Sequence, residues 1–146
     1  MDLTYDMVPI RQVCDIERAV SGKIYPKGTC YFKLSAVDDE VDQLEACGEI
    51  ESRYCAMIPH DGIDHDYLYL CVCKEFPVFL RRYRTTINLQ FNAIDHFLIP
   101  WHRDPATRAY AIKAIRMVDD EIKRVNAMIK EEKELKKWYL EKMMAQ

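Results

Sequence analysis

The sequence is poor in the features that mark several protein classes. Its 146 residues include only 4 glycines, and none of the glycine-rich motifs that hold nucleotide phosphates is present. No apolar run approaches the roughly 20 residues that a membrane-spanning helix needs. The acidic start, Met-Asp-Leu-Thr-Tyr-Asp, lacks the apolar core of a secretory signal. These absences exclude nucleotide-binding enzymes, membrane proteins and secreted proteins from our expectations, and they predict a cytoplasmic protein.

The chain also lacks the positive charge that nucleic-acid-binding proteins usually carry. It has 21 Lys and Arg against 24 Asp and Glu, a net charge of −3. Basic side chains that displace counterions from phosphates supply most of the affinity for DNA. The charge is uneven, because residues 105–146 carry 10 bases and 7 acids whereas residues 1–60 carry 6 bases and 11 acids. DNA binding would therefore need a local patch or a partner that contributes phosphate contacts.

Cysteine, in contrast, is plentiful. Without an export signal, we expect the six thiols to be reduced rather than paired in disulfides. The pair in Cys71-Val72-Cys73 lies in an apolar run, and cysteines in such a place are usually small core residues. The six are Cys14, Cys30, Cys47, Cys55, Cys71 and Cys73.

A domain boundary is predicted between Asp104 and Pro105. Asp is a favoured helix N-cap, and Pro is tolerated at the first helical position, where its missing N–H would have no partner. After Pro105 there is neither Gly nor Pro up to Met144, and a helix of about 40 residues would be about 60 Å long. We therefore expect an α+β protein, with a small mixed domain over residues 1–104 and one long C-terminal helix over residues 105–146.

The predicted long helix carries an apolar seam with coiled-coil spacing. Its positions alternate in steps of three and four, and the stripe resumes further on after a shift that resembles a stutter. The helix could pack on its own domain, or against a helix from a second copy or a partner. We favour the second interpretation, because a domain of about 100 residues has a radius of gyration of only ~13 Å. The seam consists of Ile115, Val118, Ile122, Val125, Ile129 and Leu135.

The first domain is expected to contain short elements of both kinds. The acidic run over 38–42 is most simply a solvated loop, and His60-Asp-Gly-Ile-Asp64 is expected to be a turn. The expected elements are strands over 29–35 and 49–58, a helix over 67–83 with a kink or break at Pro77, and extended chain over 88–99.

Histidines and acids gather over residues 60–66. The cluster could hold a divalent ion, or Asp64 could cap the helix that follows. We favour the cap, and we expect no metal, no cofactor and no catalytic residues, since neither a G-x-S-x-G nor another catalytic motif is present.

A basic patch is predicted at the end of the 67–83 helix. Arginines next to hydroxyls suit phosphate and base-edge contacts, but cations at a helix C-terminus are also favoured by the macrodipole alone. The sequence leaves both interpretations open. The patch consists of Arg81, Arg82, Arg84, Thr85 and Thr86, and weaker candidates of the same kind are Lys23 and Lys27.

Several loosely patterned segments follow one another in a specific order. They are residues 8–16 with Ser21-Gly22-Lys23, then 66–69, 86–100 and 134–143. In this order, the chain resembles over nearly its whole length the specificity (S) subunit of type I restriction-modification enzymes. The part of the S subunit that this chain resembles is one target recognition domain followed by one spacer helix.

The resemblance implies a non-catalytic subunit that recognises a specific sequence in double-stranded DNA. Full S subunits carry two recognition domains and two helices, so this chain resembles a half-subunit. Two copies that pair through antiparallel helices would read a palindromic interrupted site. The implied partners are an adenine-methyltransferase (M) subunit, a restriction (R) subunit and a second copy of the chain. The alternative, from another class, is an adaptor that assembles through its C-terminal coiled coil and does not bind DNA.

Overall fold

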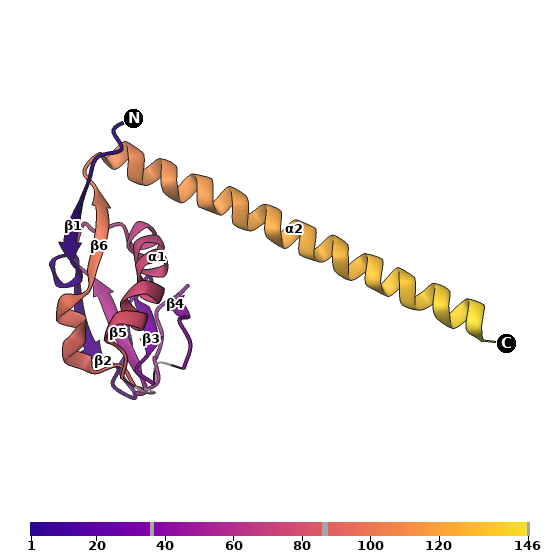
Figure 1. Cartoon of the computed structure of the whole chain (residues 1–146), viewed down its shortest axis with the longest axis horizontal. Coiled ribbons are helices and arrows are strands. Elements are labelled where there is room, and N and C mark those ends of the chain that lie inside the picture. Colours follow the sequence, from indigo (N-terminus) through magenta and orange to yellow (C-terminus); the bar gives the residue numbers. More distant parts are fainter. Residues whose placement is uncertain (36, 86–87, 146) are drawn as a thin grey trace. The chain divides into compact units, whose positions relative to one another are not determined.

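The computed structural model describes residues 1–35, 37–85 and 88–145 (Figure 1). The chain forms two compact units, of which the first is Met1–Ala109 and the second begins at Tyr110. The first unit contains two β-sheets and helix α1, and helix α2 supplies the second. The α+β class with one long C-terminal helix, predicted from the sequence, is confirmed.

A four-stranded antiparallel sheet forms the centre of the first unit. Its strands lie in the order β2 (Cys14–Arg18), β5 (Tyr54–Pro59), β3 (Cys30–Lys33) and β4 (Val41–Gln43). Side chains of β3 alternate between buried and half-buried positions, because successive residues of a strand point to opposite faces. The buried face carries Phe32 and Cys30.

Helix α1 (His65–Tyr83) and a two-stranded ribbon complete the main core. The ribbon pairs β1 (Tyr5–Pro9) with β6 (Leu98–His102), and α1 packs against both β6 and β4 (Figure 1). Phe76 of α1 lies 4.4 Å from Phe32 of β3 between ring centroids, and 6.4 Å from Phe97, which directly precedes β6. Burial of such large rings is the main stabilising contribution to a core of this size.

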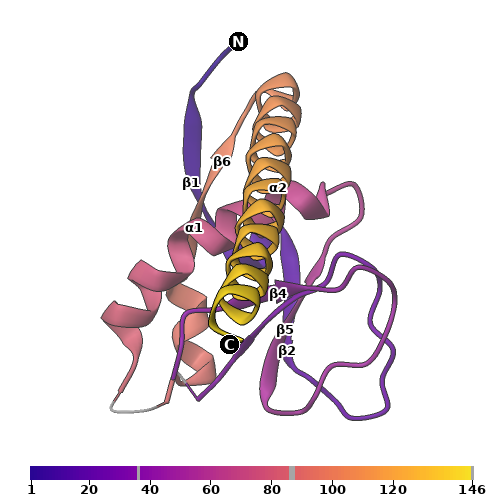
Figure 2. The same ribbon diagram turned by 90° about the vertical axis from the view of Figure 1, so that its right-hand side faces the viewer.

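A second, smaller apolar cluster contains Ala19, Tyr25, Ile50 and Ala56. Its members come from β5 and from the loops that follow β2 and β4, which extend away from α1 in Figure 2. Tyr25 is fully buried, and it forms a backbone bridge with Gly48 that joins these two loops.

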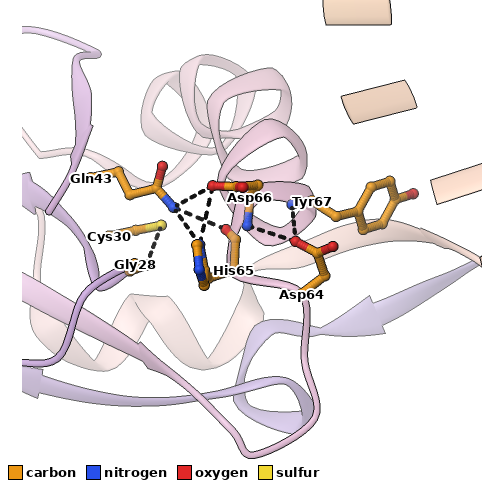
Figure 3. A network of polar contacts seen from close by, with 7 residues as sticks. All are labelled: Gly28, Cys30, Gln43, Asp64, His65, Asp66 and Tyr67. Carbon is orange, nitrogen blue, oxygen red and sulfur yellow. Dashed lines mark hydrogen bonds and ion pairs between the residues drawn. The ribbon is translucent and has the colours of Figure 1, made fainter. Parts of the chain in front are cut away.

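Helix α1 begins as the sequence predicts. The Asp64 carboxylate accepts hydrogen bonds from the backbone N–H groups of Asp66 and Tyr67, at 3.0 and 3.3 Å (Figure 3). The expected turn before it and the cap interpretation are therefore confirmed. The prediction of a break at Pro77 is wrong, because α1 continues to Tyr83. Burial of Phe79 and Leu80 after the proline outweighs the one backbone hydrogen bond that it removes.

Two other expectations for the first domain are corrected. Residues 88–99 are not extended throughout, because Phe91–His96 forms a 3-10 helix (η2) whose Ile94 is buried. The acidic run is not all loop, because Val41 and Asp42 lie in β4, where Val41 is buried. In both segments one buried aliphatic side chain decides the structure, and local composition does not reveal which side chain will be buried. The second predicted strand also begins late, at Tyr54.

Helix α2 extends over Pro105–Met144. Its start is capped by Asp104, which accepts hydrogen bonds from the Ala106 N–H and the Thr107 hydroxyl, each at 3.0 Å. The predicted N-cap and the proline at the first helical position are confirmed. No described helix is long and apolar enough to cross a membrane.

Gly28 allows the loop before β3 to approach α1 closely. Its φ is +89°, and a Cβ there would lie 2.7 Å from the Cβ of His65 (Figure 3). Gly22 has a similar φ of +83° but no atom within 4 Å of the same position. Both glycines therefore avoid the same backbone strain, and only Gly28 also avoids a clash.

We predict that Gly28→Ala destabilises the protein more than Gly22→Ala. Each substitution costs about 1 kcal/mol or more from the left-handed backbone, and Gly28→Ala adds about 1–3 kcal/mol for the forced shift of His65. Urea unfolding followed by circular dichroism measures both costs. Equal losses for the two variants would show that His65 moves aside freely.

Candidate nucleic-acid interface

The predicted basic patch lies at the C-terminal end of α1. Arg81 and Arg82 are in the last turn and Arg84 is the C-cap residue, whose backbone N–H donates to Leu80 O at 2.9 Å. The side chains of all three arginines and of Thr85 are exposed. Within the described residues, no hydrogen bond or ion pair holds any of the three guanidinium groups. Thr86, which belongs to the same predicted patch, lies outside the described residues.

The strands bring further cations to the same end of the four-stranded sheet, which points down in Figure 1. Strand β2 ends at Arg18, which pairs with Cys55, and β3 ends at Lys33, which pairs with Tyr54. Arg53 precedes β5, and its carbonyl accepts a hydrogen bond from the Leu34 N–H at 3.3 Å. We call Arg18, Lys33, Arg53, Arg81 and Arg84 the basic end.

Acidic residues offset part of this charge. Asp38 and Asp39 line a hollow of about 240 Å³ together with Arg81 and Arg84. The Asp38 carboxylate lies 3.1 Å from Lys33 Nζ, and this hydrogen bond lowers the pKa of Asp38. Arg53 is paired with the neighbouring Glu51 at 2.9 Å. Arg18, Arg81 and Arg84 are therefore the cations of the basic end that have no ion-pair partner among the described residues.

Arg82 points to a different surface from its neighbours. It lines a separate hollow with Met7, Leu98 and His96, on the side of the β1–β6 ribbon. The predicted patch is therefore divided, with Arg81 and Arg84 on one side of α1 and Arg82 on the other.

Sequence reasoning missed Arg18. Its guanidinium lies over the Phe91 ring, 5.6 Å from the centroid, and that of Arg11 lies 6.0 Å from the same ring. Arg11 also pairs with Asp95 at 2.5 Å. An exposed arginine stacked on an aromatic ring is held in one orientation at little entropic cost. Arg18 and Phe91 are 73 positions apart, so no local sequence signal could have joined them.

The two predicted lysines are not part of the basic end. Lys23 is paired with Glu17 at 2.5 Å and lies over the Tyr25 ring. Lys27 is exposed and precedes Gly28, which contacts His65 at the start of α1. Sixteen helical residues separate His65 from Arg81, a distance of about 24 Å along the axis.

Polar residues at the start of α1 form a network of their own (Figure 3). Gln43 Nε2 lies 3.2 Å from His65 Nδ1, and Asp66 Oδ1 lies 3.1 Å from the same nitrogen. In residues 1–35, 37–85 and 88–145, no group of three or more His, Cys, Asp or Glu is placed to hold a metal ion.

The buried cysteines are poor nucleophiles. Burial raises the pKa of Cys14 to about 12 and that of Cys71 to about 11, and it raises the pKa of Cys30 and Cys55 as well. The Cys71 thiol donates to the Pro100 carbonyl at 3.2 Å. These thiols are protonated at neutral pH and act as core residues, and Cys71 fits the core interpretation made from the sequence.

The seam of α2 is exposed along its length. All six predicted positions, Ile115, Val118, Ile122, Val125, Ile129 and Leu135, have between 40% and 56% of their surface exposed. Trp138 and Tyr139 continue the apolar surface at 50% and 52%. An apolar stripe of this length is typical of a helix that contacts another protein surface.

Comparisons with known proteins rest on structure alone. No family model matches the chain, and no curated protein matches its sequence. Several solved structures are similar to this chain. One is the type I restriction-modification S subunit from M. genitalium, with 10% identity, a TM-score of 0.72, and coverage of 89% of this chain and 44% of that one.

The second comes from a structure of complex assembly and conformational transition in a type I R-M system, with 14% identity and a TM-score of 0.73. The similarity covers 94% of this chain and 44% of that chain. The third is the HsdS subunit from Thermoanaerobacter tengcongensis, with 11% identity and a TM-score of 0.63. The similarity covers 85% of this chain and 39% of that chain. This chain thus spans less than half the length of each. It has the fold of type I restriction-modification S subunits.

Proposed function

We propose that the chain is a DNA-recognition subunit of a type I-like restriction-modification system and acts as half of a specificity subunit. The observation that carries the proposal is the fold. It is similar to S subunits over 85% to 94% of this chain but over only 39% to 44% of theirs, as one recognition domain with one helix would be. In this role the chain is not an enzyme, and it directs the methyltransferase and restriction subunits to their site.

The basic end is the surface we assign to DNA. It holds the guanidinium groups of Arg18, Arg81 and Arg84, which have no ion-pair partner among the described residues and can neutralise phosphates. Lys33 and Arg53 add charge that their acidic partners partly offset. Arg82, Thr85, Thr86, Lys23 and Lys27 remain candidates for further contacts.

We predict that Arg81→Ala and Arg84→Ala each weaken duplex binding similarly for all sequences. Each lost phosphate contact lowers the slope of log affinity against log salt by about one. Fluorescence anisotropy at several salt concentrations measures this slope. Lys74→Ala is the comparison variant, because Lys74 lies within α1 outside the basic end and is paired with Glu75 at 3.5 Å, and an unchanged slope is expected for it. Wild-type slopes in both arginine variants would remove Arg81 and Arg84 from the interface.

The seam of α2 is the surface we assign to a second copy of the chain. Two antiparallel helices would bury the exposed isoleucines and valines between them and would place two recognition domains in a two-fold arrangement. The seam is exposed on the single chain, so its burial in a dimer removes a large apolar surface from water.

We predict that Ile122→Asp with Ile129→Asp converts a dimer to monomers. A charge in the seam would be buried without a partner in the dimer, whereas it is solvated in the monomer. Light scattering after size-exclusion chromatography gives the mass, and circular dichroism checks the fold. Ala127→Asp, on the opposite side of α2, is the matched control and stays dimeric. Loss of the folded first unit in the double variant would mean that the seam packs within one chain.

We predict that an adenine methyltransferase subunit co-purifies with the tagged chain from its native host. A specificity subunit has no catalytic residues of its own and modifies DNA only through its partner. Mass spectrometry, with and without nuclease treatment, identifies a near-stoichiometric partner that does not depend on DNA. Recovery of an unrelated protein instead would favour the adaptor, which the net negative charge of the chain also suits.

A further inference from the structure

Side-chain amides are concentrated in one short segment next to the basic end. Residues 1–109 contain five Asn and Gln, and three of them are Asn88, Gln90 and Asn92. All three side chains are exposed. Gln90 is the N-cap residue of η2, yet its side chain makes no capping hydrogen bond. Within the described chain, none of these three amide groups has a hydrogen-bond partner.

The backbone of this segment is held firmly. Leu89 is only 3% exposed, and its N–H donates to Leu34 O at 2.9 Å, directly after β3. The Asn88 carbonyl accepts hydrogen bonds from both the N–H and the hydroxyl of Thr85 at 2.9 Å. Ile94 is buried on the other side. The buried Leu89 and Ile94 therefore anchor the backbone that carries Gln90 and Asn92, and an anchored backbone lowers the entropic cost of forming specific contacts.

Two arginines lie close to this segment, and one of them, Arg11, is paired with Asp95. Phe91 lies between Gln90 and Asn92 in the chain, and its ring carries the guanidinium groups of Arg18 and Arg11. In DNA-binding proteins, cations mainly fix the position of the protein on phosphates, whereas sequence is read by groups that match base edges. Two neutral amides on an anchored backbone, next to the unpaired guanidinium group of Arg18, can supply both kinds of contact.

An amide matches adenine in the major groove. Its oxygen and NH₂ group lie side by side, and adenine presents an N7 acceptor next to an N6 donor, so Asn and Gln form two hydrogen bonds with it. Guanine presents two acceptors in the same place and suits arginine instead. We propose that Gln90 and Asn92 are specificity-determining residues that read adenines in the DNA bound at the basic end. The inference rests on the function proposed above.

The test is selection from a random duplex library by the full-length chain, purified with whatever subunits accompany it. The wild type is expected to enrich a motif that contains adenine. Asn92→Ala should reduce the preference at one adenine about tenfold or more, and Gln90→Ala should do the same at another, while the remaining positions keep their preference. Asn92→Asp should shift that position toward cytosine, because a carboxylate accepts a hydrogen bond from cytosine N4.

Asn126→Ala is the matched control, because this amide lies on α2 and its loss should leave the motif unchanged. A wild-type protein that enriches no motif overturns the proposed function and this inference with it. A wild-type motif that persists in both Gln90→Ala and Asn92→Ala overturns the inference alone. Weaker binding with an unchanged motif does the same, since it would assign the amides to the DNA backbone.

Discussion

The burial of one face of α1 is the interaction on which the rest of the first unit depends. Phe76 contacts Phe32 of the four-stranded sheet and Phe97 before the ribbon, so the helix joins two sheets that share no strand. Helix α1 also sets the distance between the groups of residues at its two ends. The Asp64 cap and the close approach of Gly28 fix one end, and Arg81 and Arg84 are thereby held at the other, beside the ends of β2 and β3. If the C-terminal end of α1 frayed, Arg81 and Arg84 would no longer be held in place, whereas the four-stranded sheet would stay intact.

The positions of the charged residues say more about the surface of this protein than its net charge does. Acids outnumber bases in the whole chain, yet three guanidinium groups without an ion-pair partner among the described residues, those of Arg18, Arg81 and Arg84, lie at the basic end. Asp38 and Asp39 beside them reduce the local potential. A surface of this kind would bind any phosphate backbone weakly and would depend on well-fitted contacts for tight binding. In the proposed DNA-recognition role, that balance would favour discrimination between sequences over general affinity for DNA.

The parts of the structure that local chemistry determines could be predicted from the sequence. The Asp64 and Asp104 caps, the long uninterrupted α2 and the alternating strand around Cys30 all follow from a few neighbouring residues. The errors arose where a distant partner decides, as in η2, in β4 and in the continuation of α1 past Pro77. The same distinction between local and distant determinants applies to the residues of the candidate site. Arg81 and Arg84 were visible as a cluster in the sequence, whereas Arg18 is brought to the same end of the sheet only through strand register, and Lys27 is separated from that end by the length of α1.

The pairing of β1 with β6 has a consequence for the order in which the protein folds. Partners in this ribbon are 89 to 97 positions apart in the chain, from Pro9 with Leu98 to Tyr5 with His102, and contacts at such separation form late because the loop that they close is long. During synthesis, β1 has no partner until the ribosome has released β6, and α2 follows directly. The first unit can thus be complete before the seam of α2 emerges, and in the proposed dimer the chains would assemble from first units that are already folded.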